Sequence, residues 1–533
     1  MASTAATESD VGRNAPRDLE NQRHGHQDPS GQPNSPFQAG RALGRRLISM
    51  LAVEDGEVYE AHPDKNPKWY QKLLDAGVEE NGIKPVPIHQ RTLTQYNNLF
   101  TVFFTCLLGL LPIPTGMLAT LGMGMKLRDA SIIIILFSLL TCIPPAFMGI
   151  SGMETGMRQL VVARYSFGLY LVTVPLLFNA ATLTGFSLLS SIVGGQTLSV
   201  LNPSKVDVDV GIIITGLVSF AVSLLGFKAL HFWERWTWIP NLISITIAVG
   251  CGGKYLRFQS EGEPLTPSKV LTFGCLIAGY FITFGGTVSD YSIYHNPCGA
   301  SRFKLAFYIY AGLLLPSIPL LILGAAIGGA VPNVPAWEQA YSVAGVGGIM
   351  SEMLAPAGGF GKFVLVMLAL TVIGNISVSM YSVALNLQML LPFFAKVHRF
   401  VFMLMTIAIM IPMAIHAAEK WEESLTNFLA VIGYWAGCFD AVLIVELIVF
   451  REFDYSTYDH AIWNVGRKLP PGIAAIGASL VSLALVIPGM AEPWFTGPIA
   501  KTTGDIGFEM AFVVTTIAYL PFRWLEIRWR GRL

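Results

Sequence analysis

The chain has 533 residues, of which 53% are hydrophobic and 13% charged, and its 35 basic residues balance its 35 acidic residues. This composition predicts an integral membrane protein embedded in the lipid bilayer, and the lack of a basic excess argues against nucleic acid as a partner. The six cysteines lie mostly in or beside apolar segments and show no CxxC spacing, so we expect neither a disulfide framework nor a metal site.

The first segment, 1–95, is polar and rich in proline, glycine, asparagine, glutamine and charged residues. No apolar run stands at its start, so we expect no secretory signal. Such a composition predicts a cytoplasmic tail that is largely disordered.

From Tyr96 onward, apolar runs recur that are long enough to cross a bilayer as helices. They predict twelve transmembrane helices, near 96–122, 130–150, 169–198, 209–227, 236–253, 270–293, 304–330, 362–392, 399–417, 425–450, 472–490 and 506–524. Twelve spans place both termini on one side. Basic residues are concentrated in the loops after even-numbered spans and in the C-terminal segment, which predicts that both termini are cytoplasmic.

The first predicted span is interrupted by Pro112, Pro114 and Gly116 within 107–123. Proline removes a backbone donor and clashes with the preceding turn, so we expect a break in the helix near the bilayer centre. Free backbone groups are tolerated in a membrane only where they are buried in protein or line a cavity. The break is therefore a candidate binding site, and a proline kink used only for packing is the alternative.

The sixth predicted span is interrupted at 283–290, where Gly285 and Gly286 loosen the helix. Two interrupted helices separated by five spans are what an inverted five-plus-five repeat produces. We therefore predict an all-α polytopic protein with broken helices 1 and 6. Residues 96–450 would form its ten-helix repeat core, and 451–533 would add helices 11 and 12 and a short cytoplasmic C-terminus.

One face of the eighth predicted helix is polar, with intervals of four, four, three and four residues between Thr371, Asn375, Ser379, Ser382 and Asn386. Polar groups facing lipid would be costly, so this face should look inward. We assign Asn375 and Ser379 to a pocket at mid-depth. For Ser382 and Asn386 we favour hydrogen bonds between helices.

Two aromatic residues are candidates to stack on a flat ring. Phe186 shares a face of the third helix with Asn179 and Ser190, and Phe284 stands beside Gly285 in the sixth. Packing is the commoner use of a single aromatic side chain.

Few acids lie in or near the predicted spans, and acids within a membrane are candidate proton carriers. Glu234 is one candidate, and its pairing with Arg235 or His231 is the alternative. Asp440 and Glu446, on helix 10, could equally pair with basic groups at its cytoplasmic end.

Five motifs stand out along the chain: ETGMRQLVVARYSFG (154–168), SIVGGQ (191–196), HFWERWTWIP (231–240), SDYSIY (289–294) and ELIVFR (446–451). Together they resemble the fungal purine-cytosine permeases of the nucleobase cation symporter family, over about 85–530. The resemblance implies a LeuT-like fold, a substrate site between helices 1, 3, 6 and 8, and proton-coupled import of nucleobases.

The resemblance also implies roles for single residues. It puts Thr115 in the unwound part of helix 1 and Glu234 at an acid important for transport. The remaining positions would bind the substrate by stacking or by polar contact: Phe186, Ser190, Phe284, Asn375 and Ser379. No cofactor is implied beyond the coupling ion, and we expect no enzyme, because the nine histidines show no HExxH spacing.

This chain departs from the family pattern in the expected pocket. The family often has Trp at the positions of Phe186 and Phe284, Asn at Ser190, and an Asn-Asn-Ile-Pro-Asn run at 375–379. Stacking survives an exchange of Trp for Phe, but serine does not replace an amide that both donates and accepts. We expect plasma-membrane import of a purine or cytosine by proton symport and alternating access. A pyridoxine-like compound or secondary metabolite, sodium coupling, and a sensor that does not transport remain alternatives.

Overall fold

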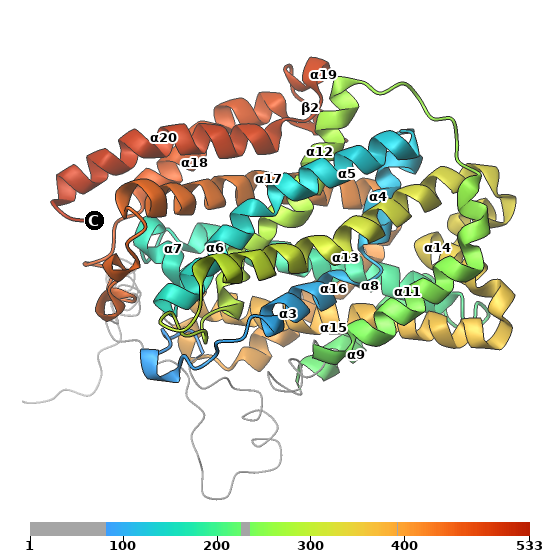
Figure 1. Cartoon of the computed structure of the whole chain (residues 1–533), viewed down its shortest axis with the longest axis horizontal. Helices are drawn as coiled ribbons and strands as arrows, with labels where there is room; N and C mark the ends of the chain where they lie inside the picture. The colour runs from blue at the N-terminus through green and yellow to red at the C-terminus, as the bar shows by residue number, and fades with distance from the viewer. Residues whose placement is uncertain (1–81, 225–234, 392) are drawn as a thin grey trace, which may run out of the picture. The chain divides into compact units, whose positions relative to one another are not determined.

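The computed structural model describes residues 82–224, 235–391 and 393–533 (Figure 1). These residues are mainly helical, with a two-stranded antiparallel sheet in which Ala491–Glu492 (β1) pairs with Phe495–Thr496 (β2). Eight helices of the described part are long and apolar enough to cross a membrane, or nine with one bent pair counted as a span. Every predicted span overlaps at least one helix, which confirms the all-α polytopic prediction.

The first six predicted spans correspond to α3 (Asn97–Leu107) with α4 (Pro112–Met117) and the π-helical turn η2 (Leu118–Gly122), α5 (Leu127–Thr141) with α6 (Ile143–Thr155), α8 (Thr173–Ser199), α9 (Val208–Ser223), α11 (Trp238–Gly252), and α12 (Pro267–Ile282) with the 3-10 turns η4 (Thr283–Gly286) and η5 (Val288–Tyr291). The last six correspond to α13 (Arg302–Ala330), α15 (Gly358–Leu390), α16 (Arg399–Ala418), α17 (Trp421–Val445) with η9 (Glu446–Phe450), α18 (Ile473–Gly489) and α20 (Gly507–Arg530). Three more helices join them: α7 (Gln159–Phe167), α14 (Pro335–Leu354) and α19 (Ala500–Thr503).

The first span is broken one turn earlier than its prolines predict. Helix α3 ends at Leu107, α4 begins at Pro112, and the two segments are bent by 62°. Pro112 stands in the first turn of α4, where a backbone N–H has no acceptor within the helix, so its absence in proline costs no hydrogen bond. The prolines therefore start the second half of the span, and the break itself is the four-residue segment 108–111.

Gly116 has a separate reason to be glycine. A methyl group added there would overlap the backbone carbonyl of Leu321 in α13, and one added at Gly324 would overlap that of Ile113 in α4. The two glycines let the α4 and α13 backbones approach closely, as small residues do in membrane helix pairs.

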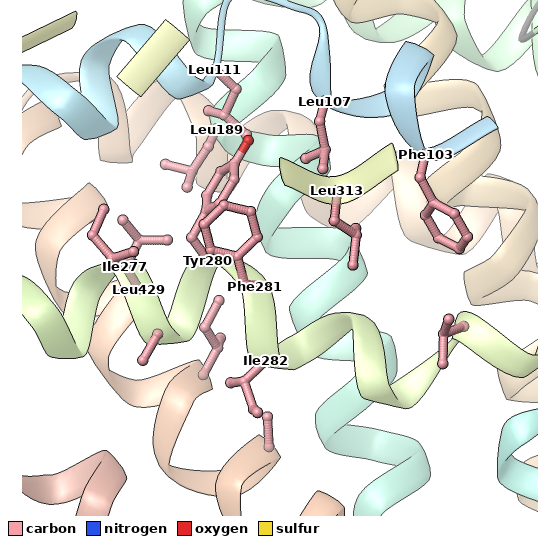
Figure 2. Close-up of a cluster of buried hydrophobic side chains, with 14 of the residues drawn as sticks. Phe103, Leu107, Leu111, Leu189, Ile277, Tyr280, Phe281, Ile282, Leu313 and Leu429 are labelled. Atoms are coloured by element: carbon pink, nitrogen blue, oxygen red, sulfur yellow. The ribbon is translucent and has the colours of Figure 1, made fainter. Parts of the chain in front are cut away.

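The sixth span is broken where the sequence predicts. After α12 the chain continues as η4 and η5, separated by Thr287, whose φ is −137°. Figure 2 shows the apolar core beside both breaks. There Leu107 and Leu111 flank the break of the first span, and Tyr280 and Phe281 project from α12 into the same cluster.

The last part of the predicted tail is ordered, which differs from the expected disorder up to residue 95. The guanidinium of Arg91 is buried and donates to the carbonyls of Val86, Glu154 and Thr155 at 2.9, 3.0 and 2.8 Å. These bonds fix 82–95 against the end of α6. Residues 1–81, which make up most of the predicted tail, lie outside the described residues.

A buried ionic network joins the end of α17 to α20, which lies beside α18 (Figure 1). Glu446 accepts hydrogen bonds from Arg523 Nη2 at 2.7 Å, from Arg451 Nε at 3.0 Å and from the Tyr519 hydroxyl at 2.9 Å. Arg523 also pairs with Glu526 at 2.7 Å. The proposed pairing of Glu446 with basic groups is thus confirmed.

Candidate functional site

A cavity of about 70 Å³ lies between the two broken spans and the helices α8 and α15. Such a volume holds several water-sized groups, because one of them needs roughly 10–15 Å³. The break of the first span contributes Gly109, Leu110 and Leu111, so backbone outside regular helix borders the cavity. This is the setting in which unwound backbone is tolerated inside a membrane.

Two phenylalanine rings form part of the cavity wall, and other aromatic rings hold each of them edge-on. The Phe186 ring centroid is 5.1 Å from that of Phe428 and 6.2 Å from that of Tyr280, at interplanar angles of 89° and 86°. Phe284 meets Phe103 at 6.1 Å and 78°. Edge-to-face contacts are the preferred arrangement of aromatic pairs, so they fix the orientation of both rings.

Asn375 is the polar side chain of the cavity with the most spare hydrogen-bonding capacity. Its Oδ1 accepts a weak hydrogen bond from Cys106 Sγ at 3.7 Å, and its amide nitrogen has no protein partner in the described part of the chain. By contrast, the hydroxyls of Thr371 and Thr283 donate to the carbonyls of Leu368 and Gly279 in their own spans. Asn375 therefore offers two donors and an acceptor to a ligand.

A wider vestibule of about 540 Å³ adjoins this cavity and shares Tyr291, Val378 and Ser382 with it. Its wall includes the ion pair between Arg158 Nη1 and Asp290 Oδ2, 3.3 Å apart. The vestibule lies at the end of the helices where the ordered tail residue Leu93 is found.

His295 also lines the vestibule. Burial lowers the pKa of His295, while its contacts with the backbone of Gln95 and Ser292 act in the opposite direction. A lowered pKa keeps the ring neutral at neutral pH. The fixed charges of the vestibule wall are therefore those of the Arg158–Asp290 pair and Arg235.

Residues 85–509 match the model of a protein family described as permeases for cytosine and purines, uracil, thiamine and allantoin. The chain belongs to this permease family. The predicted membership of the purine-cytosine permeases among the nucleobase cation symporters is confirmed, and the protein is a multi-pass membrane transporter and not an enzyme.

Relatives of this permease include the purine-cytosine permease fcyB of Emericella nidulans, 31% identical over 90% of this chain and 94% of the relative. The purine-cytosine permease FCY2 of Saccharomyces cerevisiae is 30% identical over 90% of this chain and 92% of the relative. The vitamin B6 transporter TPN1 of the same yeast is 26% identical over 87% and 90%.

Among solved structures, the nucleobase-cation-symport-1 family transporter Mhp1, in a closed conformation with bromovinylhydantoin bound, matches with a TM-score of 0.64. It is 14% identical and covers 84% of this chain and 96% of its own. The likeness shows that the permease has the fold of Mhp1 and confirms the predicted LeuT-like architecture.

Four of the predicted site residues line the cavity between the two helix breaks. They are Phe186 on α8, Phe284 on η4, and Asn375 and Ser379 on α15. These side chains come from three elements that are distant in sequence, so their meeting is a property of the fold.

The other three predicted site residues do not meet there. Thr115, expected in unwound backbone, lies inside α4, where its hydroxyl donates to the Leu111 carbonyl at 3.2 Å, because the break comes one turn earlier. Ser190 lies one turn beyond Phe186, is buried, does not line the cavity and has no hydrogen-bond partner within the described ranges. Glu234 lies outside the described residues.

The permease cavity also has wall residues that the sequence analysis did not select. Thr182 stands one turn before Phe186, and Tyr280 one turn before Phe284, so the four-residue spacing of a helical face is the signal that would have found both. Thr182 Oγ1 accepts a hydrogen bond from Trp435 Nε1 at 2.9 Å, which ties the wall to α17. Ser382, expected to bond between helices, lines both the cavity and the vestibule.

Proposed function

We propose that this permease imports a purine or cytosine across the plasma membrane by proton symport, with both termini in the cytoplasm. The observation that carries the proposal is the cavity at the two helix breaks, which combines two aromatic rings with the amide of Asn375. A planar nitrogen heterocycle presents two apolar faces and a polar edge. Rings suit the faces, and an amide suits the edge.

In this proposal the substrate ring stacks between Phe186 and Phe284. Asn375 and Ser379 bond its edge from α15, and the backbone around Gly109 bonds it from the break of the first span. These backbone groups need no side chain to act as donors and acceptors. The small cavity favours a free base over a nucleoside, because a sugar would add a second ring.

Alternating access would expose this site to the two sides of the membrane in turn. The vestibule adjoins the cavity at the end of the helices where Leu93 lies, and in this proposal that end faces the cytoplasm. With this orientation, the wider approach to the cavity would open on the cytoplasmic side. Substrate would leave through this vestibule, past the Arg158–Asp290 pair.

A pyridoxine-like compound is the second candidate substrate. Ser190 stands outside the cavity wall, so Asn375 and Ser379 are left as the main polar contacts for a ring edge. Fewer edge contacts suit a heterocycle with fewer polar edge groups, and one relative is a vitamin B6 transporter.

Uptake of labelled cytosine, adenine, hypoxanthine and pyridoxine tests the proposal in cells that lack their own carriers for these compounds. We expect saturable accumulation of a nucleobase that a protonophore abolishes. Accumulation of pyridoxine alone would favour the second candidate. Binding without uptake in isolated membranes would indicate a sensor and contradict the transport proposal.

A further inference from the structure

Asp440, on α17, is fully buried, and neither of its carboxylate oxygens has a hydrogen-bond partner among the residues that the structure describes. The carboxylate lies directly against the backbone of Gly285 in η4. A methyl group added to Gly285 would overlap both oxygens. Glycine at this position therefore lets the carboxyl group reach the break of helix 6.

The residue before Asp440 on α17 and the residue after Gly285 in η4 both contact apolar or neutral side chains. Phe439, the preceding residue, stacks on Phe167 at 5.8 Å and meets Trp435 at 5.9 Å. The next residue, Gly286, faces Asn179, whose Oδ1 also lacks a donor in the described ranges. Two buried polar groups without donors thus flank the two glycines of η4.

The ionisable groups on the elements packed around α17 do not pair with Asp440. Helices α8 and α18 and the turn η4 carry none. Most of the others have partners elsewhere. The charged residues pair as Glu446 with Arg451 and Arg523, Glu154 with Arg302, Lys269 with Glu263, and Asp290 with Arg158. The remaining hydrogen bonds join Tyr519 to Glu446, Tyr434 to Asp505, Arg164 to Asn464, and Tyr165 to the Asp459 carbonyl. The rest are the thiols of Cys275 and Cys438, the phenol of Tyr280, Glu492 on β1 and Glu509 in the first turn of α20. The ends of three helices carry the others: Glu422 and Glu423 in the first turn of α17, Arg399 and His416 on α16, and the basic residues and Glu526 at the far end of α20.

An ionised carboxylate without a partner is very costly inside a membrane protein, whereas the protonated acid is neutral and can itself donate a hydrogen bond. We propose that Asp440 is the binding site of the coupled proton, and that the break of helix 6 links this proton to the substrate. This inference rests on the proposed function and names a coupling residue for it. It differs from the predicted coupling residue Glu234, which lies outside the described residues.

The link runs through two adjacent residues. Phe284 lines the substrate cavity, and Gly285 contacts the Asp440 carboxyl group. A movement of η4 that shifts Phe284 also shifts the backbone beside the carboxyl group. Coupling of this kind is reciprocal, so a substrate that favours this geometry of η4 tightens proton binding, and the proton tightens substrate binding by the same factor.

The decisive experiment compares wild type and Asp440→Asn in proteoliposomes, by uptake under an imposed proton gradient and by exchange at equal pH. Asparagine keeps the shape of the side chain but cannot titrate. We expect exchange of labelled for unlabelled nucleobase to persist, accumulation to fall to the equilibrium level, and substrate affinity to lose its dependence on pH. Glu509→Gln, the same change of an acid on the neighbouring α20, should behave as wild type.

Asp440→Glu provides a second test if the asparagine variant does not fold. It keeps a titratable group in an altered position, so its pH profile of substrate affinity should shift. A wild-type profile for this variant, or gradient-driven accumulation by Asp440→Asn, would overturn the inference. Accumulation by wild type on a sodium gradient alone would overturn it too. Wild type that accumulates no heterocycle at all would refute the proposed function, and this inference with it.

Discussion

Replacing Phe186 by alanine should raise the KM for nucleobase uptake roughly 10- to 100-fold, because stacking of a base on an aromatic ring contributes about 1–3 kcal/mol. Phe186 lines the cavity, and its contacts with Phe428 and Tyr280 hold it edge-on to both. The alanine variant loses the ring while the other wall of the cavity, at Phe284, remains. Initial rates of labelled uptake, normalised to protein at the cell surface, measure the effect.

Two variants separate stacking from packing. Phe186→Leu keeps most of the apolar volume without a ring, so it should lose nearly as much affinity as alanine. Phe363→Ala makes the same truncation on α15 at a side chain that is 56% exposed and outside the cavity, and it should leave the KM unchanged. A wild-type KM for Phe186→Ala at normal surface expression would refute the stacking role.

Glu446→Gln should strongly destabilise the folded protein. Glu446 and Arg523 are fully buried, and Glu446 accepts hydrogen bonds from Arg451, Arg523 and Tyr519. Removing one partner of a buried charge network typically costs about 3–5 kcal/mol, because the remaining charges stay buried without compensation. We expect a large fall in the melting temperature of the detergent-solubilised protein. The size-exclusion profile of a fluorescent fusion, recorded after heating, measures this temperature.

Glu419→Gln serves as the control for this loss. Glu419 is 70% exposed and lies 3.6 Å from His416, an arrangement that contributes little at a surface. Its melting temperature should match wild type. Equal melting of Glu446→Gln and wild type would show that the network does not stabilise the fold.

The length and spacing of apolar runs predict the helical architecture well, because span length follows directly from bilayer thickness. The break in helix 6 is also predicted correctly, since Gly285 and Gly286 mark it. The break in helix 1 is displaced by one turn. Pro112 and Pro114 look like interruptions in the sequence, but proline in a first turn costs the helix nothing.

Part of the site is predictable from the periodicity of polar residues along one helix. Asn375 and Ser379 follow from a four-residue polar period, and the structure places both at the cavity. Ser190 is excluded from the cavity wall because of where the neighbouring helices approach α8. The periodicity along one helix does not encode that approach. The sequence likewise shows several intramembrane acids without showing that Glu446 is paired by distant arginines and Asp440 is not.

The most direct test of the account is uptake by the purified permease, reconstituted alone in sodium-free proteoliposomes. Labelled cytosine and adenine would be supplied with and without an inward proton gradient, at a clamped membrane potential. We predict accumulation above equilibrium only with the gradient, and its loss on adding a protonophore. Equal uptake with and without the gradient would contradict proton symport, and no uptake of either base would contradict the proposed substrate class.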